Sequence, residues 1–481
     1  MVRYDKFFWG IAQDDRLQSV GQYTYGEALN TRNGKYVELE KKVETVAITA
    51  MWSNNYFTCN FENYFCDTLW RLWEYDGSTM TELADAWEAD IWDIVKFNDW
   101  DFYLFALNEF FIYDGSTPSI GGTSVSLNST FKRHPIVVWD DALFFINWKQ
   151  IGKILITAPT TVVQFWSAFT KPFETEWNIV GLTYHANSLW CYDEYGKMYV
   201  LDCQSEEVIS FKNFFETIEY VHDSNQWYDI ILFSEGNIQT IEMNYWVAPD
   251  SNKTLRKRYF SKIMRENYSG TNSWFIFNRG TSGQSGNLAI TTGGTTYWMS
   301  DEQSEQVLYS YGSEKNVIPP SVTIMTTGDL GLLRSVMKYN ESIFLSANVS
   351  WGSARLYKID LGSDATFAYQ LSGFLITKID DFWQYEIPKT IRQVMLGADI
   401  PTWTSIKLEY SINEGEFVEY KTITKTDAIW TNGKKFEFST PIEMFNEISW
   451  RITLTTNNEA VTPRLYSFSH LLDTEIYEPS Q

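Results

Sequence analysis

A short sequence that ends in Tyr-Asp-Gly-Ser-Thr occurs twice in this chain, and it limits the folds that the chain can adopt. The first copy covers residues 72–79 and the second covers residues 111–117, so Tyr75 and Tyr113 are 38 positions apart. In each copy an apolar and aromatic run stops at Asp-Gly, a dipeptide that supplies the positive φ angles of a tight hairpin turn. Strand, turn and strand repeated at about 40 residues are typical of β-propeller blades.

A second recurrent pattern agrees with that spacing. Large apolar residues flank a short turn centred on Asn or Asp, and such turns tolerate the left-handed conformation. Asn98 and Asp140 are 42 positions apart, and Asp140 and Asn187 are 47 apart. The same pattern returns at Asn340. We therefore predict an all-β fold with a β-propeller of about seven blades, with six or eight as alternatives.

The blade spacing divides the chain into three predicted parts. Residues 1–46 are polar and weakly patterned, and we expect an extended N-terminal arm. Residues 47–372 form the propeller, and a strand within residues 43–51 is expected to complete its last blade. The uncharged Gly, Thr and Ser stretch at 280–300 is expected to be a long loop. Residues 373–481 alternate differently and predict a small antiparallel β-sandwich.

Composition narrows the class of protein. Aromatic residues make up 17% of the 481 positions, which suits strands, and the formal charge of −23 disfavours simple binding to nucleic acid or to anionic membranes. The four cysteines have no metal-binding spacing, so we expect them to be reduced core residues. The start of the chain lacks the apolar core of a signal peptide, and we find no apolar run typical of a membrane span.

The sequence contains no motif typical of an enzyme. It lacks a nucleophile elbow, a zinc-protease helix, a P-loop and a dinucleotide fingerprint, and its four histidines fall in separate modules. We therefore predict a protein that is not an enzyme and has no catalytic residue, cofactor or metal site. The histidines are expected to be structural or on the surface.

One cluster of alternating tryptophans and acids is a candidate carbohydrate contact. Propellers can hold the paired carboxylates of a glycosidase, so a carbohydrate-binding or glycoside-cleaving propeller is the alternative function. A spacing of two also fits a solvated strand face opposite a buried aromatic face. The candidate residues are Trp87, Trp92, Asp99, Trp100 and Asp101.

One basic segment contrasts with the acidic remainder of the chain. Its alternatives are a contact with an acidic neighbouring subunit, an exposed connector, or a polyanion contact with nucleic acid. The residues are Lys253, Arg256, Lys257, Arg258, Lys262 and Arg265.

The whole arrangement resembles virion proteins of tailed bacteriophages that have a propeller and a C-terminal β-sandwich. Residues 9–15 leading to 29–32 look like the arm of phage tail propellers. Residues 406–417, and residues 448–454 followed by 462–468, are similar to the terminal sandwich of phage tail and baseplate proteins. No catalytic residue is carried over from this resemblance, and the chain is much shorter than the nozzle proteins of short-tailed phages.

The resemblance implies a structural role. We expect a tail, nozzle or collar protein that is made in the host cytoplasm, resides in the virion, and acts there as a multimeric platform or docking element. Its partners would be copies of itself and other virion subunits. Nucleic acid would contact it only during passage and without sequence specificity. A third reading is an intracellular propeller that serves as a scaffold for protein partners.

Overall fold

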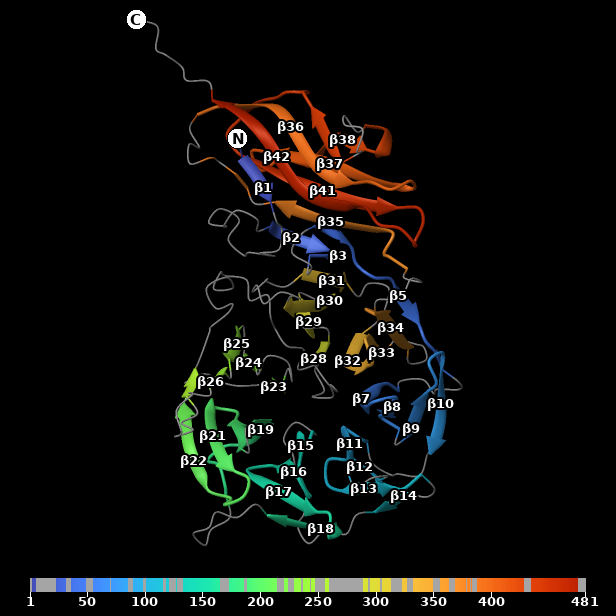
Figure 1. Ribbon diagram of the computed structural model, residues 1–481, viewed down its shortest axis with the longest axis vertical. Coiled ribbons are helices and arrows are strands. Elements are labelled where there is room, and N and C mark those ends of the chain that lie inside the picture. The colour runs from blue at the N-terminus through green and yellow to red at the C-terminus, as the bar shows by residue number, and fades with distance from the viewer. Residues whose placement is uncertain are drawn as a thin grey trace, which may run out of the picture.

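The chain folds into a ring of small β-sheets with a further pair of sheets at one edge of the ring (Figure 1). Within the described residues, helical conformation is limited to a 3₁₀ turn at Lys425–Asp427, and none of them form a helix long and apolar enough to cross a membrane. This computed structural model describes residues 2–5, 23–31, 36–48, 55–69, 71–84, 90–97, 101–115, 118–120, 127, 133–164, 173–185, 188–213, 220–223, 229–234, 237–242, 244–246, 256–258, 289–292, 295–302, 305–312, 322–326, 332–348, 355–362, 368–377, 379–380, 382, 387–427 and 434–474.

Seven sheets follow one another around the ring, and we number them as blades 1 to 7. Blade 1 consists of β7 (Phe57–Phe61), β8 (Tyr64–Asp67), β9 (Leu72–Tyr75) and β10 (Thr79–Ala84). Blade 2 consists of β11 (Asp93–Phe97), β12 (Asp101–Phe105), β13 (Phe110–Tyr113) and β14 (Pro118–Ile120). Blade 3 consists of β15 (Ile136–Trp139), β16 (Ala142–Asn147), β17 (Gln150–Leu155) and β18 (Ala158–Gln164).

The remaining blades continue in the same order. Blade 4 consists of β19 (Ile179–His185), β20 (Ser188–Asp193), β21 (Lys197–Asp202) and β22 (Val208–Asn213), and blade 5 of β23 (Tyr220–Asp223), β24 (Asp229–Ser234) and β25 (Asn237–Glu242). Blade 6 consists of β28 (Ala289–Thr292), β29 (Thr295–Glu302), β30 (Glu305–Gly312) and β31 (Val322–Thr326), and blade 7 of β32 (Leu332–Tyr339), β33 (Ser342–Asn348) and β34 (Arg355–Asp360). Figure 1 shows the first strand of each blade nearest to the centre of the ring. The predicted all-β propeller is confirmed.

The turns explain why these segments form hairpins. Gly77 and Gly115 have φ angles of 103° and 89°, a region that favours glycine, as the repeated Asp-Gly predicts. Asp140 and Asn340 have φ angles of 51° and 52°, which confirms the second turn pattern at these two positions. The stretch predicted to be a loop at 280–300 instead includes β28 and most of β29, because threonine suits a strand as well as a turn.

The N-terminal segment closes the ring. The strand β5 (Val43–Thr45) pairs antiparallel with β34 and becomes the outer strand of blade 7, which confirms the expected closing strand. The next strand, β6 (Ala47–Ile48), pairs with β10 of blade 1. The propeller sheets therefore begin before residue 47, because a ring is held closed when the two ends of its chain share one sheet. A shared core that includes Val46, Phe57 and Phe344 packs blades 7 and 1 together.

Two antiparallel sheets form the C-terminal part. The first has the order β1 (Val2–Asp5), β42 (Arg464–Thr474), β36 (Lys389–Asp399) and β39 (Lys435–Phe438), and β40 (Ile442–Phe445) also pairs with β36. The second contains β2 (Tyr23–Glu27), β35 (Ser372–Thr377), β41 (Ile448–Thr456), β37 (Thr404–Ile412) and β38 (Val418–Ile423). Side chains of both sheets share one core around Trp450, which is the arrangement of a β-sandwich.

The sandwich and the propeller are connected through hydrogen-bonded strands. β2 pairs with β35 of the sandwich and, at Glu27 and Thr323, with β31 of blade 6, so one nine-stranded sheet runs through both parts. A short sheet of β3 (Leu29–Asn30) and β4 (Glu38–Leu39) lies beside this junction. Because a Cβ at Gly373 would lie 2.6 Å from the carbonyl oxygen of Ala28, the close approach of the two segments requires glycine.

Candidate functional site

The predicted carbohydrate cluster does not form an accessible aromatic site in the described part of the chain. Trp92 is 1% exposed and donates its backbone N–H to the carbonyl of Phe105. Asp101 begins β12 and pairs with Phe97. Trp92 is therefore corrected from a candidate contact to a core residue, because it packs where the chain enters blade 2. Trp87, Asp99 and Trp100 lie outside the described residues.

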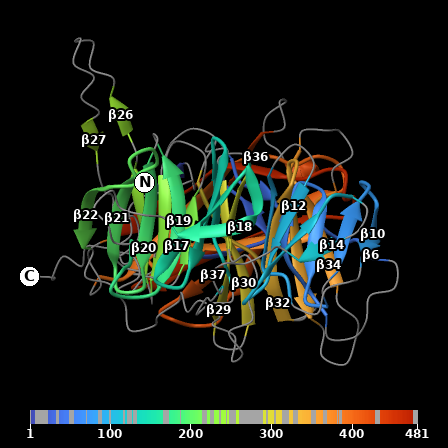
Figure 2. The same ribbon diagram turned by 90° about the horizontal axis from the view of Figure 1, so that it is seen from below.

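Part of the predicted basic segment forms a strand. Arg256, Lys257 and Arg258 make up β27 (Arg256–Arg258), which pairs with β26 (Asn244–Trp246). Figure 2 shows this pair standing out from the ring beside blade 4. The backbone register brings these three basic residues opposite Asn244, Tyr245 and Trp246. Lys253, Lys262 and Arg265 lie outside the described residues.

Six of the seven inner strands contain one carboxylate, Asp93, and it is held by other groups, while the seventh, β23, ends at Asp223. Asp93 is the one acidic residue among β7, β11, β15, β19, β28 and β32. Its Oδ1 atom lies 2.8 Å from the Arg133 guanidinium, and its Oδ2 atom accepts the backbone N–H of His134 at 2.7 Å. A glycosidase needs two carboxyl groups about 5–9 Å apart. These six strands contain no such pair, and Asp93 instead ties blade 2 to blade 3.

Two histidines, His134 and His470, and all four cysteines are parts of the core. His134 is buried between the carbonyls of Leu107 and Ile146. His470 is buried beside Trp450 and Phe468, and burial lowers its pKa to about 3. All four cysteines are buried and free, as predicted. Across the described ranges, no three His, Cys, Asp or Glu side chains gather in a way that could hold a metal ion.

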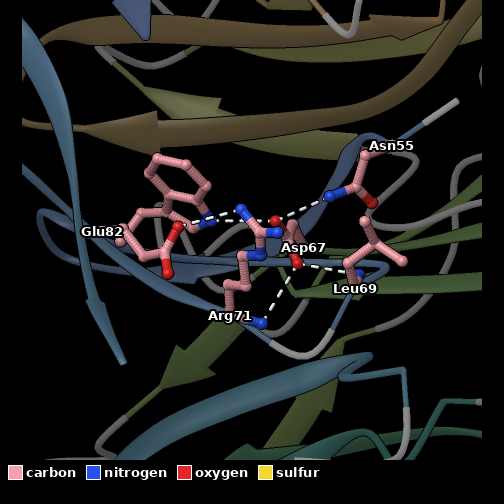
Figure 3. A network of polar contacts seen from close by, with 6 residues as sticks. Asn55, Asp67, Leu69, Arg71 and Glu82 are labelled. Atoms are coloured by element: carbon pink, nitrogen blue, oxygen red, sulfur yellow. Dashed lines mark hydrogen bonds and ion pairs between the residues drawn. The ribbon is translucent and has the colours of Figure 1, made fainter. Parts of the chain in front are cut away.

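A buried carboxylate organises the turn between β8 and β9 (Figure 3). The Oδ1 atom of Asp67 accepts the backbone N–H groups of Leu69 at 2.8 Å and Arg71 at 3.1 Å. Its Oδ2 atom accepts the Asn55 amide at 2.8 Å and the Trp73 indole N–H at 2.9 Å. Burial raises the pKa of Asp67 to about 6, while the bonds from Trp73, Leu69 and Arg71 oppose that rise. All four donors come from blade 1, so this network is structural.

Three exposed aromatic residues lie on neighbouring turns of blades 3 and 4, and two of their rings contact each other. Trp148 lies in the β16–β17 turn and is 46% exposed, Trp177 lies just before β19 and is 38% exposed, and Tyr195 lies in the β20–β21 turn and is 51% exposed. The ring centroids of Trp177 and Tyr195 are 4.3 Å apart with an interplanar angle of 42°. We call these three residues the aromatic surface.

Backbone hydrogen bonds hold the turns of the aromatic surface together. The carbonyl of Trp148 accepts the N–H of Ile179 at 2.9 Å, and the carbonyl of Lys149 accepts the N–H of Thr175 at 2.9 Å. The hydroxyl of Thr175 in turn donates to the carbonyl of Trp177. These bonds align the segment that carries Trp177 with the turn that carries Trp148.

The side chain of Asp193 fixes the turn that carries Tyr195. The Oδ1 atom of the buried Asp193 accepts the N–H groups of Tyr195 at 3.1 Å and Lys197 at 2.8 Å. The Asn178 amide donates to Glu194 at 3.1 Å and connects this turn to the residue after Trp177. Lys197 forms an ion pair with Glu176, and this hydrogen bond raises the pKa of Lys197. The rings are therefore surrounded by polar and charged groups.

Sequence reasoning missed the aromatic surface because its members are far apart and none belongs to a repeated motif. One local signal was present at Trp148. It occupies a two-residue hairpin turn between Asn147 and Gln150, where small and polar residues are preferred, and its φ angle is 59°. A bulky aromatic residue in such a turn is a reason to look for a surface role.

Comparisons with known proteins do not assign the chain to a family. No protein-family model matches the sequence, and no curated protein does. Solved structures that are similar include the β-propeller domain of Cps50 (Swd1) from Myceliophteria thermophila, with 12% identity, a TM-score of 0.43, and coverage of 64% of this chain and 98% of that chain. BamB from Moraxella catarrhalis has 10% identity and a TM-score of 0.40 over 67% of this chain and 99% of that one.

A computationally designed protein, Ika8, is also similar in structure, with 8% identity and a TM-score of 0.37 over 66% of this chain and 100% of that one. With TM-scores below 0.5, these three likenesses carry no argument about what this chain does. The blades of the propeller are read from the strand pairing of the chain itself.

Proposed function

We propose that the chain is a non-enzymatic structural component of a tailed-phage virion, where it acts as a multimeric platform or docking element in a tail, nozzle or collar. The observation that supports this proposal is the nine-stranded sheet that joins blade 6 through β2 to the C-terminal sandwich. A platform that holds other subunits in place within a particle needs its propeller and its sandwich to keep a fixed relative orientation. Hydrogen bonds between strands restrict that orientation more than a flexible linker does.

The sandwich offers a place for docking to a neighbouring virion subunit. Trp403 is 65% exposed with a φ angle of 77°, which is uncommon for a bulky residue. Leu371 is 55% exposed, and the carbonyls of Leu371 and Trp403 accept bonds from the consecutive residues Thr456 and Asn457. These two apolar residues therefore lie at the same end of one sheet. Tryptophan is among the residues that most often dominate the energy of protein interfaces.

Particles of the phage that carries this gene allow a direct test. We expect mass spectrometry of purified particles to find more than one copy of the chain in each particle, and mass photometry of the free chain to find a multimer. A Trp403→Ala phage should incorporate at least about tenfold less of the chain. A Trp177→Ala phage is the matched control, since it changes an exposed tryptophan of the propeller. A wild-type chain that is monomeric and absent from particles would overturn the proposal.

Six of the seven inner strands lend no support to the alternative of glycoside cleavage, because Asp93 is their single carboxylate and is paired with Arg133. An intracellular scaffold is the remaining reading. It predicts capture of protein partners from cells that contain no phage particles, whereas the virion proposal predicts that the chain sediments with the particles.

A further inference from the structure

We infer that the aromatic surface formed by Trp148, Trp177 and Tyr195 is a binding site for an uncharged glycan. The inference does not depend on the virion role. It starts from the exposure of 38–51% for these three aromatic residues, in a chain where Trp73, Trp92, Trp190, Trp298 and Trp450 are fully buried. Aromatic side chains are usually placed in the core, so three exposed ones on adjoining turns need an explanation.

The geometry of the aromatic surface suits a sugar ring. A pyranose presents one face of C–H bonds, whose positive polarisation matches the negative face of an aromatic ring. Trp177 and Tyr195 meet at 42°, so they form a tilted pair instead of a parallel stack. Hydrogen-bonding groups lie beside the rings, because Glu194 is the neighbour of Tyr195 in the chain and accepts from Asn178, the neighbour of Trp177.

The site is organised before a ligand arrives. Asp193 fixes the backbone of Tyr195, and Thr175 fixes the backbone of Trp177. The Lys149 ammonium donates to the carbonyl of Glu176 at 2.9 Å, which fastens the intervening segment. Binding therefore orders few additional groups, and this reduces the entropic cost of association.

Charge favours an uncharged ligand over a nucleic acid, although bases also stack on aromatic side chains. Glu174, Glu176 and Glu194 outnumber Lys149 and Lys197 around the rings, and the whole chain has a formal charge of −23. A phosphate backbone binds mainly to clustered Lys and Arg. The acidic surroundings of the aromatic surface would repel it.

The size of the aromatic surface favours a glycan over a protein partner. A large aromatic side chain has about 150–250 Å² of surface, so three that are roughly half exposed offer about 300 Å² in total. A stable protein interface buries about 800 Å² on each partner. Ion pairs such as Lys197–Glu176 border the rings and limit the extension of an apolar contact.

A glycan array tests the inference with the purified full chain. We use neutral hexose oligosaccharides, with sialylated and sulfated glycans as charged probes, and then measure affinity for the best neutral probe by isothermal titration calorimetry. Trp177→Ala and Tyr195→Ala should each weaken binding by about tenfold or more. Tyr195→Phe keeps the ring and should change affinity less than about threefold. Trp403→Ala is the matched control and should bind as the wild type does.

Each remaining outcome contradicts the inference. It is overturned if no neutral glycan binds, if only sulfated or sialylated glycans bind, or if Trp177→Ala and Tyr195→Ala bind as the wild type does. It is also overturned if Trp403→Ala loses affinity to the same extent, because binding would then not reside on blades 3 and 4. Far-ultraviolet circular dichroism of each variant confirms that the chain has folded. Loss of particle incorporation in Trp403→Ala alone would leave glycan binding intact, so the two proposals fail separately.

Discussion

The turns after the second strand of blades 1 and 4 share one hydrogen-bond pattern but differ in the position of the aromatic side chain. In both blades a buried aspartate ends the second strand, and its Oδ1 atom accepts the backbone N–H groups two and four residues further on. Asp67 binds Leu69 and Arg71 in this way, and Asp193 binds Tyr195 and Lys197. The two turns differ in what the second carboxylate oxygen contacts and in where the aromatic side chain lies.

In blade 1 the aromatic residue belongs to the core. Trp73, six residues after Asp67, is fully buried and donates its indole N–H to the second oxygen of Asp67. In blade 4 the residue six positions after Asp193 is the half-buried Tyr199, and the aromatic residue at the tip of the turn, Tyr195, is exposed. The same aspartate-capped turn can therefore complete the core or expose an aromatic ring to solvent. The position of the aromatic residue in the turn decides which of the two occurs.

The largest expected effect is on the stability of blade 1. Asp67→Ala removes an acceptor from four donors and leaves the Asn55 amide and the Trp73 indole N–H buried without it, so we expect a loss of about 4 kcal/mol in the free energy of unfolding. Urea unfolding followed by tryptophan fluorescence measures this loss. Asp76→Ala is the control, because Asp76 accepts from Ser78 and Thr79 in an exposed turn, and should cost much less than Asp67→Ala. Equal losses in the two variants would show that the buried network adds nothing.

The next effect is a pH dependence that is specific to Asp67. Its pKa is raised from 3.8 to about 6 in the folded chain, mainly by burial, so the folded chain binds the proton more tightly than the unfolded chain. Its contribution to stability is therefore present in full below pH 4 and declines as the pH rises to about 6, by up to about 3 kcal/mol. We expect the stability difference between the wild type and Asp67→Asn to shrink over this window. A difference that grows with pH would show that the four donors stabilise the carboxylate form more than burial destabilises it.

The sequence predicts the repeating part of this fold because hairpin turns depend on local chemistry. Gly77, Gly115, Asp140 and Asn340 are in turns of the expected type, and each turn is decided by two or three neighbouring residues. The closing strand was also predictable, since a ring of blades needs one. The connection through β2 was not, because its pairing with β31 and β35 depends on contacts between segments that are about 300 residues apart.

The candidate site was less predictable than the fold. Trp92 looks like a surface ligand in the sequence because acids alternate with it, yet its side chain is buried in the core just before β11 begins. Trp148, Trp177 and Tyr195 belong to three different turns, and only the packing of blade 3 against blade 4 brings these turns together. The spacing of residues in one sequence cannot predict that these three turns lie side by side.

A smaller effect is expected in blade 4. Asp193→Ala removes the acceptor of two backbone N–H groups, but the Oδ2 atom of Asp193 is buried and has no hydrogen-bond partner among the described residues, and burial raises the pKa of this carboxyl. Losing a carboxylate that is only half satisfied should cost about 2 kcal/mol, or about half of the loss at Asp67. Urea unfolding of both variants in the same buffer tests the ratio. A loss as large as that of Asp67→Ala would mean that the second oxygen contributes as much in blade 4 as in blade 1.

The smallest expected effect on stability belongs to the ring that the blade 4 turn presents to solvent. Tyr195 is 51% exposed and contacts one aromatic neighbour, Trp177, so Tyr195→Ala should change the free energy of unfolding by less than about 0.5 kcal/mol. Trp73→Ala in blade 1 removes a buried ring and an indole donor, and should cost about 4 kcal/mol. If thermal unfolding shows that Tyr195→Ala is as damaging as Trp73→Ala, the exposed ring is part of the core after all. If Tyr195→Ala changes the free energy of unfolding little but lowers glycan affinity strongly, Tyr195 serves binding and not packing. Removal of a ring that packs in the core would lower the stability of the chain much more.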